Sequence, residues 1–299
     1  MSTIQWEDLV KDGQREVVKR LDYNTKANLR RCSKDTKDMV DSVRFVFKRF
    51  LFEIGKCDGM DCVTIENGHE KHKFIGNEEQ TIVQLHGKAE RIENSDYIDA
   101  AQRYFNGCLD RQNNKAIAMT IKTNQSDRFP IIRLKSAEDV RIFCSNISSE
   151  YVPRLQTLLN SLKNVKNLTF HCNQPIQPFE SMKDISAMTL NTPHFLNDNQ
   201  LLELNAKSLT ISSTQMTESG VRQLLKKRML NGIKCEIWIN LTTSGADIAN
   251  GFQSEQVEHP MIGTRYVIMK LDGCNLKGVM QMMDGGVKIR VVDVNKPNF

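Results

Sequence analysis

The first forty residues contain three short apolar stripes at helical spacing, and these stripes constrain the fold more than any other part of the chain. In order, the stripes comprise Val17, Val18 and Leu21, then Leu29 and Cys32, then Met39, Val40 and Val43. Thr25 and Ser33 stand where the second and third helices need N-cap residues. Three helices of about eight to ten residues cannot bury a core alone, so the segment predicts a small module that a partner completes.

Four ordered motifs run through this module. They are Trp6 with Leu9, Val17-Val18 with Leu21-Asp22, Asn28-Leu29-Arg30 with Cys32-Ser33-Lys34, and Val40-Asp41-Ser42. In this order they resemble the F-box of the large nematode-type F-box families. The sequence departs from that pattern at Val10, where the family usually has proline, and it has no tryptophan in the predicted third helix.

The resemblance implies a substrate receptor of a Skp–cullin–F-box (SCF) ubiquitin ligase. A Skp-family adaptor, and through it a cullin, would bind the F-box at residues 1–45. The implied adaptor-binding residues are Trp6, Leu9, Val10, Val17, Val18, Leu21, Leu29, Cys32 and Val40. Residues 46–299 would be the F-box-associated region, which would recruit a target protein. The chain would not be an enzyme, because other subunits would transfer ubiquitin by proximity.

A basic nucleic-acid-binding module is the alternative interpretation. Residues 11–49 contain twelve Lys and Arg against six Asp and Glu, a surplus larger than the whole-chain net charge of +5. The predicted phosphate contacts are Arg30, Arg31, Lys34 and Lys37. Asp35, Asp38 and Asp41 alternate with them and would face the phosphates, so we regard nucleic acid as the less favoured partner.

The chain after the module mixes strand-like and helix-like segments, which indicates an α/β layer. We predict strands at 44–54, 62–66, 81–85, 116–121 and 140–144, with a polar connection between the second and third. We predict helices at 96–109 and 149–162, capped by Ser95 and Ser149.

A loose repeat follows at about 165–240. The segments NVKNLTF, DISAMTL, NAKSLTI and KCEIWI each contain a short apolar strand. Taking Leu168, Met188, Leu209 and Ile237 as equivalent gives steps of 20, 21 and 28 residues. Helical segments lie between them, most clearly at 217–229 with Thr217 as N-cap. This period resembles leucine-rich-repeat architecture, in which one strand and one helix or turn stack per unit.

The last part of the chain predicts an antiparallel β-meander at about 264–293. Strand-like runs at 266–270, 276–282 and 287–292 are separated by Asp272-Gly273 and Asp284-Gly285, which are hairpin signals. The overall fold class is therefore α+β or α/β. A three-helix F-box precedes a larger domain that contains leucine-rich-repeat-like units and a closing meander.

No catalytic motif is present, and we expect no cofactor. The sequence lacks a phosphate-binding glycine loop, a nucleophile elbow and a zinc-protease helix. Cys57, Cys62, His69 and His72 could supply zinc ligands, but their spacing matches no common framework, so we expect no metal. His171 and Cys172 are adjacent on a predicted strand and would point to opposite faces.

Composition predicts an ordinary soluble chain of the cytoplasm or nucleus. Apolar residues make up 39% and charged residues 26%, and no run of eighteen apolar residues predicts a membrane span. Eight cysteines without framework spacing are expected to be free thiols in a reducing compartment.

Overall fold

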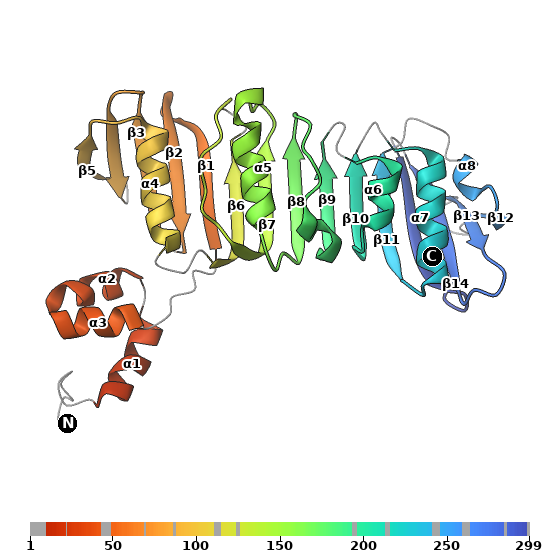
Figure 1. Cartoon of the computed structure of the whole chain (residues 1–299), viewed down its shortest axis with the longest axis horizontal. Helices are drawn as coiled ribbons and strands as arrows, with labels where there is room; N and C mark the ends of the chain where they lie inside the picture. Colours follow the sequence, from red (N-terminus) through yellow and green to blue (C-terminus); the bar gives the residue numbers. More distant parts are fainter. Residues whose placement is uncertain are drawn as a thin grey trace.

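A computed structural model gives the fold of the chain. It describes residues 10–21, 23–42, 49–68, 70–85, 88–110, 115–123, 126–192, 196–212, 216–240, 246–258, 264–283 and 286–297. Figure 1 shows a group of helices at the N-terminal end and a long sheet with other helices in front of it. The mixed α and β architecture agrees with the predicted fold class.

The N-terminal helices are α1 (Lys11–Arg20), α2 (Tyr23–Cys32) and α3 (Lys34–Ser42). The third begins as predicted, because the Ser33 hydroxyl accepts a hydrogen bond from the Thr36 amide at 3.1 Å. Thr36 Oγ1 reciprocates by accepting from the Ser33 amide at 3.0 Å. The predicted cap of the second helix is wrong, because Thr25 lies inside α2 rather than before it.

Fifteen strands form one sheet in the part of the chain that the structure describes. Five pair at one end: β1 (Arg49–Cys57), β2 (Met60–Asn67), β3 (Glu70–Gly76), β4 (Thr81–Leu85) and β5 (Lys88–Glu93). Six make the middle: β6 (Lys115–Lys122), β7 (Ser136–Cys144), β8 (Asn167–Cys172), β9 (Ala187–Asn191), β10 (Ser208–Ser212) and β11 (Cys235–Asn240). Four close the other end: β12 (Gln253–Glu258), β13 (Arg265–Lys270), β14 (Leu276–Met283) and β15 (Gly286–Asp293).

The strands are parallel in the middle of the sheet and antiparallel at both ends. The order is β12-β13-β14-β15-β11-β10-β9-β8-β7-β6-β1-β2-β3-β4-β5. Strand β1 pairs parallel with β6 but antiparallel with β2, and β11 pairs antiparallel with β15. The meander predicted at 264–293 is confirmed as antiparallel, and β12 extends it by one strand.

The four equivalent positions of the repeat are direct neighbours in the sheet. Leu168 pairs with Met188, Met188 with Leu209, and Leu209 with Ile237. All four side chains are buried. Helical segments follow the strands as predicted: α5 (Val152–Ser161), a 3-10 turn η3 (Glu180–Asp184), α6 (Asp198–Glu203) and α7 (Glu218–Leu230). Thr217 caps α7 by accepting from the Gly220 amide at 3.1 Å.

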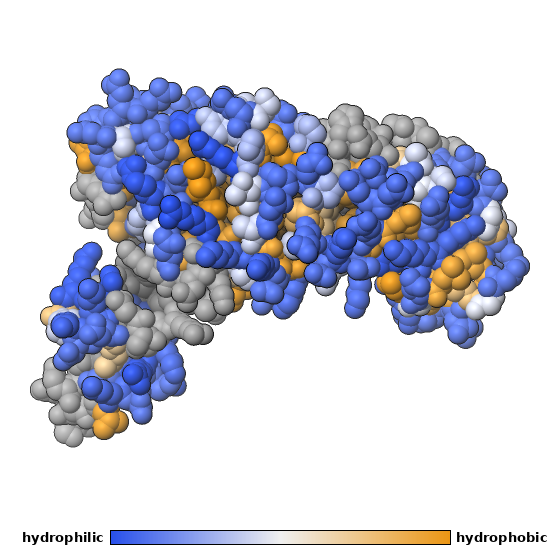
Figure 2. Space-filling model, viewed as in Figure 1, coloured by the Kyte–Doolittle hydropathy of each residue, from blue (hydrophilic) through white to orange (hydrophobic). Residues whose placement is uncertain are grey.

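Helices α4 (Tyr97–Asp110), α5, α6 and α7 lie together on one face of the sheet (Figure 1). Helix α4 lies on β2, β3 and β4, while α7 lies on β14 and β15 and contacts α6 and α8 (Ala246–Ala249). Figure 2 shows this helical side as mostly hydrophilic. The core is therefore the layer between the helices and the sheet, and we call the opposite surface of the strands the open face.

Helix α4 also holds an extended segment that the sequence pattern does not predict. The Asn106 side chain donates to the Ile131 carbonyl at 2.8 Å and accepts from the Arg133 amide at 3.0 Å. One turn earlier, Gln102 accepts from the Ile131 amide at 2.7 Å. These bonds replace the pairing that a neighbouring strand would provide, and they hold Phe129 and Leu134 in the core.

Both predicted caps of the two middle helices are corrected. Asp96 rather than Ser95 caps α4, because its Oδ1 accepts from the Ile98 and Asp99 amides at 2.9 and 3.0 Å. Asp96 also pairs with Arg128 at 2.9 Å, and that hydrogen bond raises the arginine pKa. Ser149 opens a short 3-10 turn, η2 (Ser149–Tyr151), and α5 starts after it.

Candidate interaction surfaces

The N-terminal helices place two adjacent valines on opposite sides. Val18 is completely buried inside the module, whereas 38% of Val17 is exposed. Val10, directly before α1, is 78% exposed. An apolar side chain in water on so small a module is a candidate contact for a partner, because covering it removes apolar area from water. Val18 is part of the module's own packing.

The other predicted adaptor-binding residues differ in how far they are exposed to solvent. Leu21, Leu29 and Val40 are partly buried, and Cys32 is exposed with its thiol donating to the Asn28 carbonyl at 3.3 Å. Trp6 and Leu9 lie outside the described residues.

The basic residues of the module are mixed with acids on the same helices. Arg31, Lys34 and Lys37 are exposed, as are Asp35 and Asp38 among them. On α1, Arg15 pairs with Asp12 at 3.3 Å and Lys19 pairs with Glu16. This mixture of signs does not make the continuous positive surface that a phosphate backbone favours.

A row of side chains that includes four threonines crosses the open face. Successive strand pairings align Thr120, Arg141, Thr169, Thr189, Thr210, Trp238 and Lys288, one from each of seven neighbouring strands. We call this set the threonine row. Hydroxyl groups at strand spacing can donate and accept hydrogen bonds, and Trp238 adds an indole that is 37% exposed. Tryptophan is the residue type most often central to protein interfaces.

A second row lies beside the threonine row. It aligns Phe143 with His171, His171 with Asn191, Asn191 with Ser212, and Ser212 with Asn240. The rings of Phe143 and His171 lie 5.0 Å apart, and Asn191 Nδ2 lies 3.3 Å from His171 Nδ1. Burial lowers the pKa of His171, which favours the neutral ring that can accept from the amide. Cys172 points into the core, so the predicted separation of His171 and Cys172 is confirmed.

Several charges of the open face are paired with each other. Lys122 contacts Glu53 at 3.3 Å, the Arg141 guanidinium contacts both carboxylate oxygens of Asp139 at 3.1 Å, and Lys288 pairs with Glu236 at 2.5 Å. The open face therefore presents hydroxyls, amides and aromatic rings, with charges that are paired locally.

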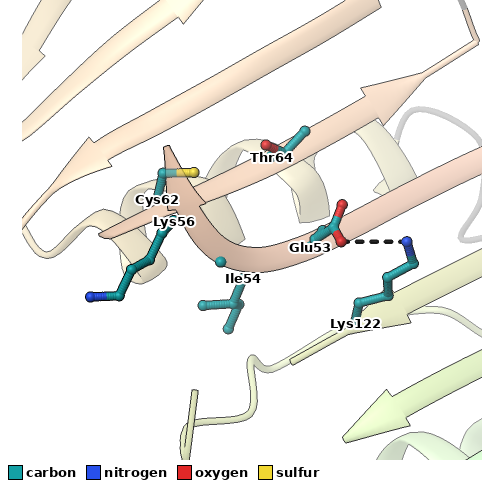
Figure 3. Close-up of a pocket in the computed structure, with 7 residues that line it drawn as sticks. Glu53, Ile54, Lys56, Cys62, Thr64 and Lys122 are labelled. Carbon is teal, nitrogen blue, oxygen red and sulfur yellow. Dashed lines mark hydrogen bonds and ion pairs between the residues drawn. The ribbon is translucent and has the colours of Figure 1, made fainter. Parts of the chain in front are cut away.

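A cavity of about 310 Å³ opens near the β1–β2 end of the sheet (Figure 3). Its lining includes Glu53 and Lys122, which the figure joins by their ion pair, and Thr64 and Cys62 on the neighbouring strand.

The four candidate zinc ligands are not brought together. Cys57 and Cys62 lie on the open face, whereas His72 lies on the helical side, where its Nε2 is 2.7 Å from the Tyr104 hydroxyl. His69 lies outside the described residues. Among the described residues no group of three or more His, Cys, Asp or Glu could hold a metal ion. No described helix is long and apolar enough to cross a membrane.

Of three comparisons with known proteins, one finds a match. No curated protein and no solved structure matches the chain. A family model, the F-box domain, matches residues 6–48. F-box domains bind Skp1-type adaptors within SCF complexes. The three-helix module at the start of this chain is therefore an F-box domain. The first strand of the large sheet, β1, follows it along the chain.

Proposed function

We propose that the protein is a substrate receptor of an SCF ubiquitin ligase. Its F-box would bind a Skp-family adaptor, and through it a cullin, and the sheet domain would hold a target protein. The chain would contribute no catalytic residue, since its role would be to place the target beside enzymes that other subunits carry.

The observation that carries this proposal is the F-box match together with the orientation of the two valines on α1. Val18 packs inside, and Val17 and Val10 remain in contact with water. The adaptor would cover these exposed residues together with parts of Leu21, Leu29 and Val40.

The adaptor contact is tested by placing a carboxylate at Val17 in the full chain. Val17→Asp together with Leu21→Asp should weaken binding to a purified Skp-family adaptor by roughly a thousandfold, because each buried unpaired charge costs several kcal/mol. The matched charge control is Arg30→Ala with Lys34→Ala, which should cost about tenfold or less. Calorimetry measures both affinities, and circular dichroism confirms that each variant is folded.

The same pair of variants separates the two functional classes. A basic module that binds nucleic acid would reverse the order, with the alanine pair losing salt-sensitive binding to duplex DNA. Adaptor affinity that is unchanged in the aspartate variant would rule out the proposed contact. Val18→Asp is a third control, and it should unfold the module because Val18 is buried.

The target protein would bind the open face across the threonine row. This assignment is supported by the exposed Trp238 among hydroxyl groups and by the position of helices α4, α5, α6 and α7 on the opposite side of the sheet in Figure 1. Trp238→Ala should keep adaptor affinity unchanged and reduce by about tenfold the proteins that co-purify with the chain, measured by quantitative mass spectrometry. Leu230→Ala, which removes an apolar side chain that is 69% exposed at the end of α7, is the control and should change neither.

A further inference from the structure

Two cysteines lie close together on the open face at the end of the first hairpin. Cys57 is the last residue of β1 and pairs with Met60, while Cys62 on β2 pairs with Gly55. Side chains two residues apart on a strand share a face, so the thiols are diagonal neighbours across the hairpin. Burial raises the pKa of Cys62 most, and the neighbouring Cys57 raises it further.

A lysine of β3 contacts the Cys57 thiol. Lys73 pairs with Thr64 across β2 and β3, and its Nζ lies 2.9 Å from Cys57 Sγ. The contact with Cys57 raises the pKa of Lys73, so the amine stays protonated. A negative charge on the Cys57 sulfur would have this ammonium as its partner. The Cys57 thiol also lies 3.6 Å from the Asp58 carboxylate.

The Cys62 thiol is more deeply buried than the Cys57 thiol. Cys62 is 4% exposed, and burial is the main reason that its pKa is raised. It still lines the 310 Å³ cavity of Figure 3. The pair therefore combines a partly exposed sulfur beside an ammonium with a protonated thiol next to it. This is the arrangement of an attacking and a resolving cysteine.

We propose that Cys57 and Cys62 form a peroxide-reactive pair. The Cys57 thiolate attacks hydrogen peroxide, the O–O bond breaks, and the products are a Cys57 sulfenic acid and hydroxide. The Cys62 thiol then attacks the sulfenic sulfur, the S–O bond breaks, and a disulfide and one water are formed. Each peroxide accepts the two electrons that the two thiols lose. The proposal does not depend on the adaptor contact.

Other cysteines provide contrasts within the same chain. Cys144 and Cys172 are direct neighbours on β7 and β8, but 0% and 4% of their surfaces are exposed and both face the core. Cys32 is exposed, and its described contact is with the Asn28 carbonyl. Cys32 is therefore the internal control for accessibility without the ammonium of Lys73.

The test exposes the full, reduced chain to hydrogen peroxide and follows each cysteine by peptide mass spectrometry with dimedone, a probe for sulfenic acid. Cys57 should react on the order of tenfold faster than Cys32. The wild-type chain should yield a peptide cross-linked between Cys57 and Cys62. Cys62→Ser should instead accumulate the dimedone adduct at Cys57.

Two lysine variants on the same face of β3 decide whether the ammonium is responsible. Lys73→Met should slow Cys57 oxidation by about tenfold, whereas Lys71→Met should leave it unchanged, because Lys71 pairs with Glu66 at 2.8 Å instead. The proposal is overturned if Cys57 reacts no faster than Cys32, if the two lysine variants behave alike, or if oxidation yields no cross-link between Cys57 and Cys62.

Discussion

At the scale of single residues, the least expected side chain is the buried Arg228 of α7. It is 2% exposed, its Nη2 donates to the Leu204 carbonyl, and its Nη1 has no hydrogen-bond partner among the described residues. Burial lowers the pKa of Arg228, and it raises the pKa of neighbouring Cys235 to about 11. Burying a guanidinium costs desolvation energy, and a carbonyl contact offsets that cost only in part.

Two replacements of Arg228 should therefore separate the contributions of its volume and of its charge to the free energy of unfolding. Arg228→Met keeps most of the volume and removes the charge, so the free energy of unfolding should stay unchanged or rise by up to about 2 kcal/mol. Arg228→Ala leaves a cavity and should lower it by about 2–4 kcal/mol. Urea denaturation of both variants measures these values. A loss of more than about 2 kcal/mol in the methionine variant would show that Arg228 stabilises the fold through its charge.

At the scale of elements, apolar periodicity locates the buried strands and misses edge or two-sided strands. Strand β4 falls at the predicted residues, and the aligned repeat positions are neighbours in the sheet. The sequence predicts a polar connection where β3 lies. Lys71 and Lys73 interrupt the apolar pattern there, although Phe74 and Ile75 are buried. Strands β5 and β12 lie at the two edges of the sheet, and every side chain of β12 is exposed or only partly buried, so β12 shows no apolar pattern.

A candidate site can be predicted from the sequence only where its residues lie close together along the chain. The F-box motifs are contiguous, so the amino-acid sequence alone identifies them. The threonine row takes one residue from each of seven strands, and its members are far apart in sequence. Lys73 approaches Cys57 because β2 lies between their strands, and the sequence carries no signal for that contact.

Strand β1 shows where the two parts of the chain can be cut. A start at Phe52 would remove Phe50, which is 2% exposed and packs edge-to-face on Phe105 at 5.4 Å. A fragment of residues 43–299 should melt cooperatively near the temperature of the full chain and lose adaptor binding. A fragment of residues 52–299 should be less stable by about 3–5 kcal/mol.

Calorimetric melting checks this difference, and Phe50→Ala in the full chain is the control for the lost side chain alone. Equal melting temperatures for the two fragments would show that the start of β1 is dispensable. Retained adaptor binding by the 43–299 fragment would contradict the assignment of the adaptor contact to the F-box.

At the scale of the whole molecule, the sheet is long, open and protected at its two edges. The edge strand β5 contains Lys88 and Glu93, and every described residue of β12 except Val257 is exposed and polar. Charged and polar edge strands disfavour pairing with another chain. The antiparallel strands at both ends thus terminate a parallel array that would otherwise present unpaired backbone groups at β1 and β11.

The position of β1 in the sheet sets the reach of the molecule. Four strands lie on one side of β1 and ten on the other. Neighbouring strands are about 4.8 Å apart, so the far edge lies roughly 48 Å from the strand that follows the F-box. Each middle strand pairs only with its two neighbours, so inserting or deleting one strand-and-helix unit would change that distance by about one strand spacing. Under the proposed function, this distance would set how far from the adaptor the sheet can hold a target.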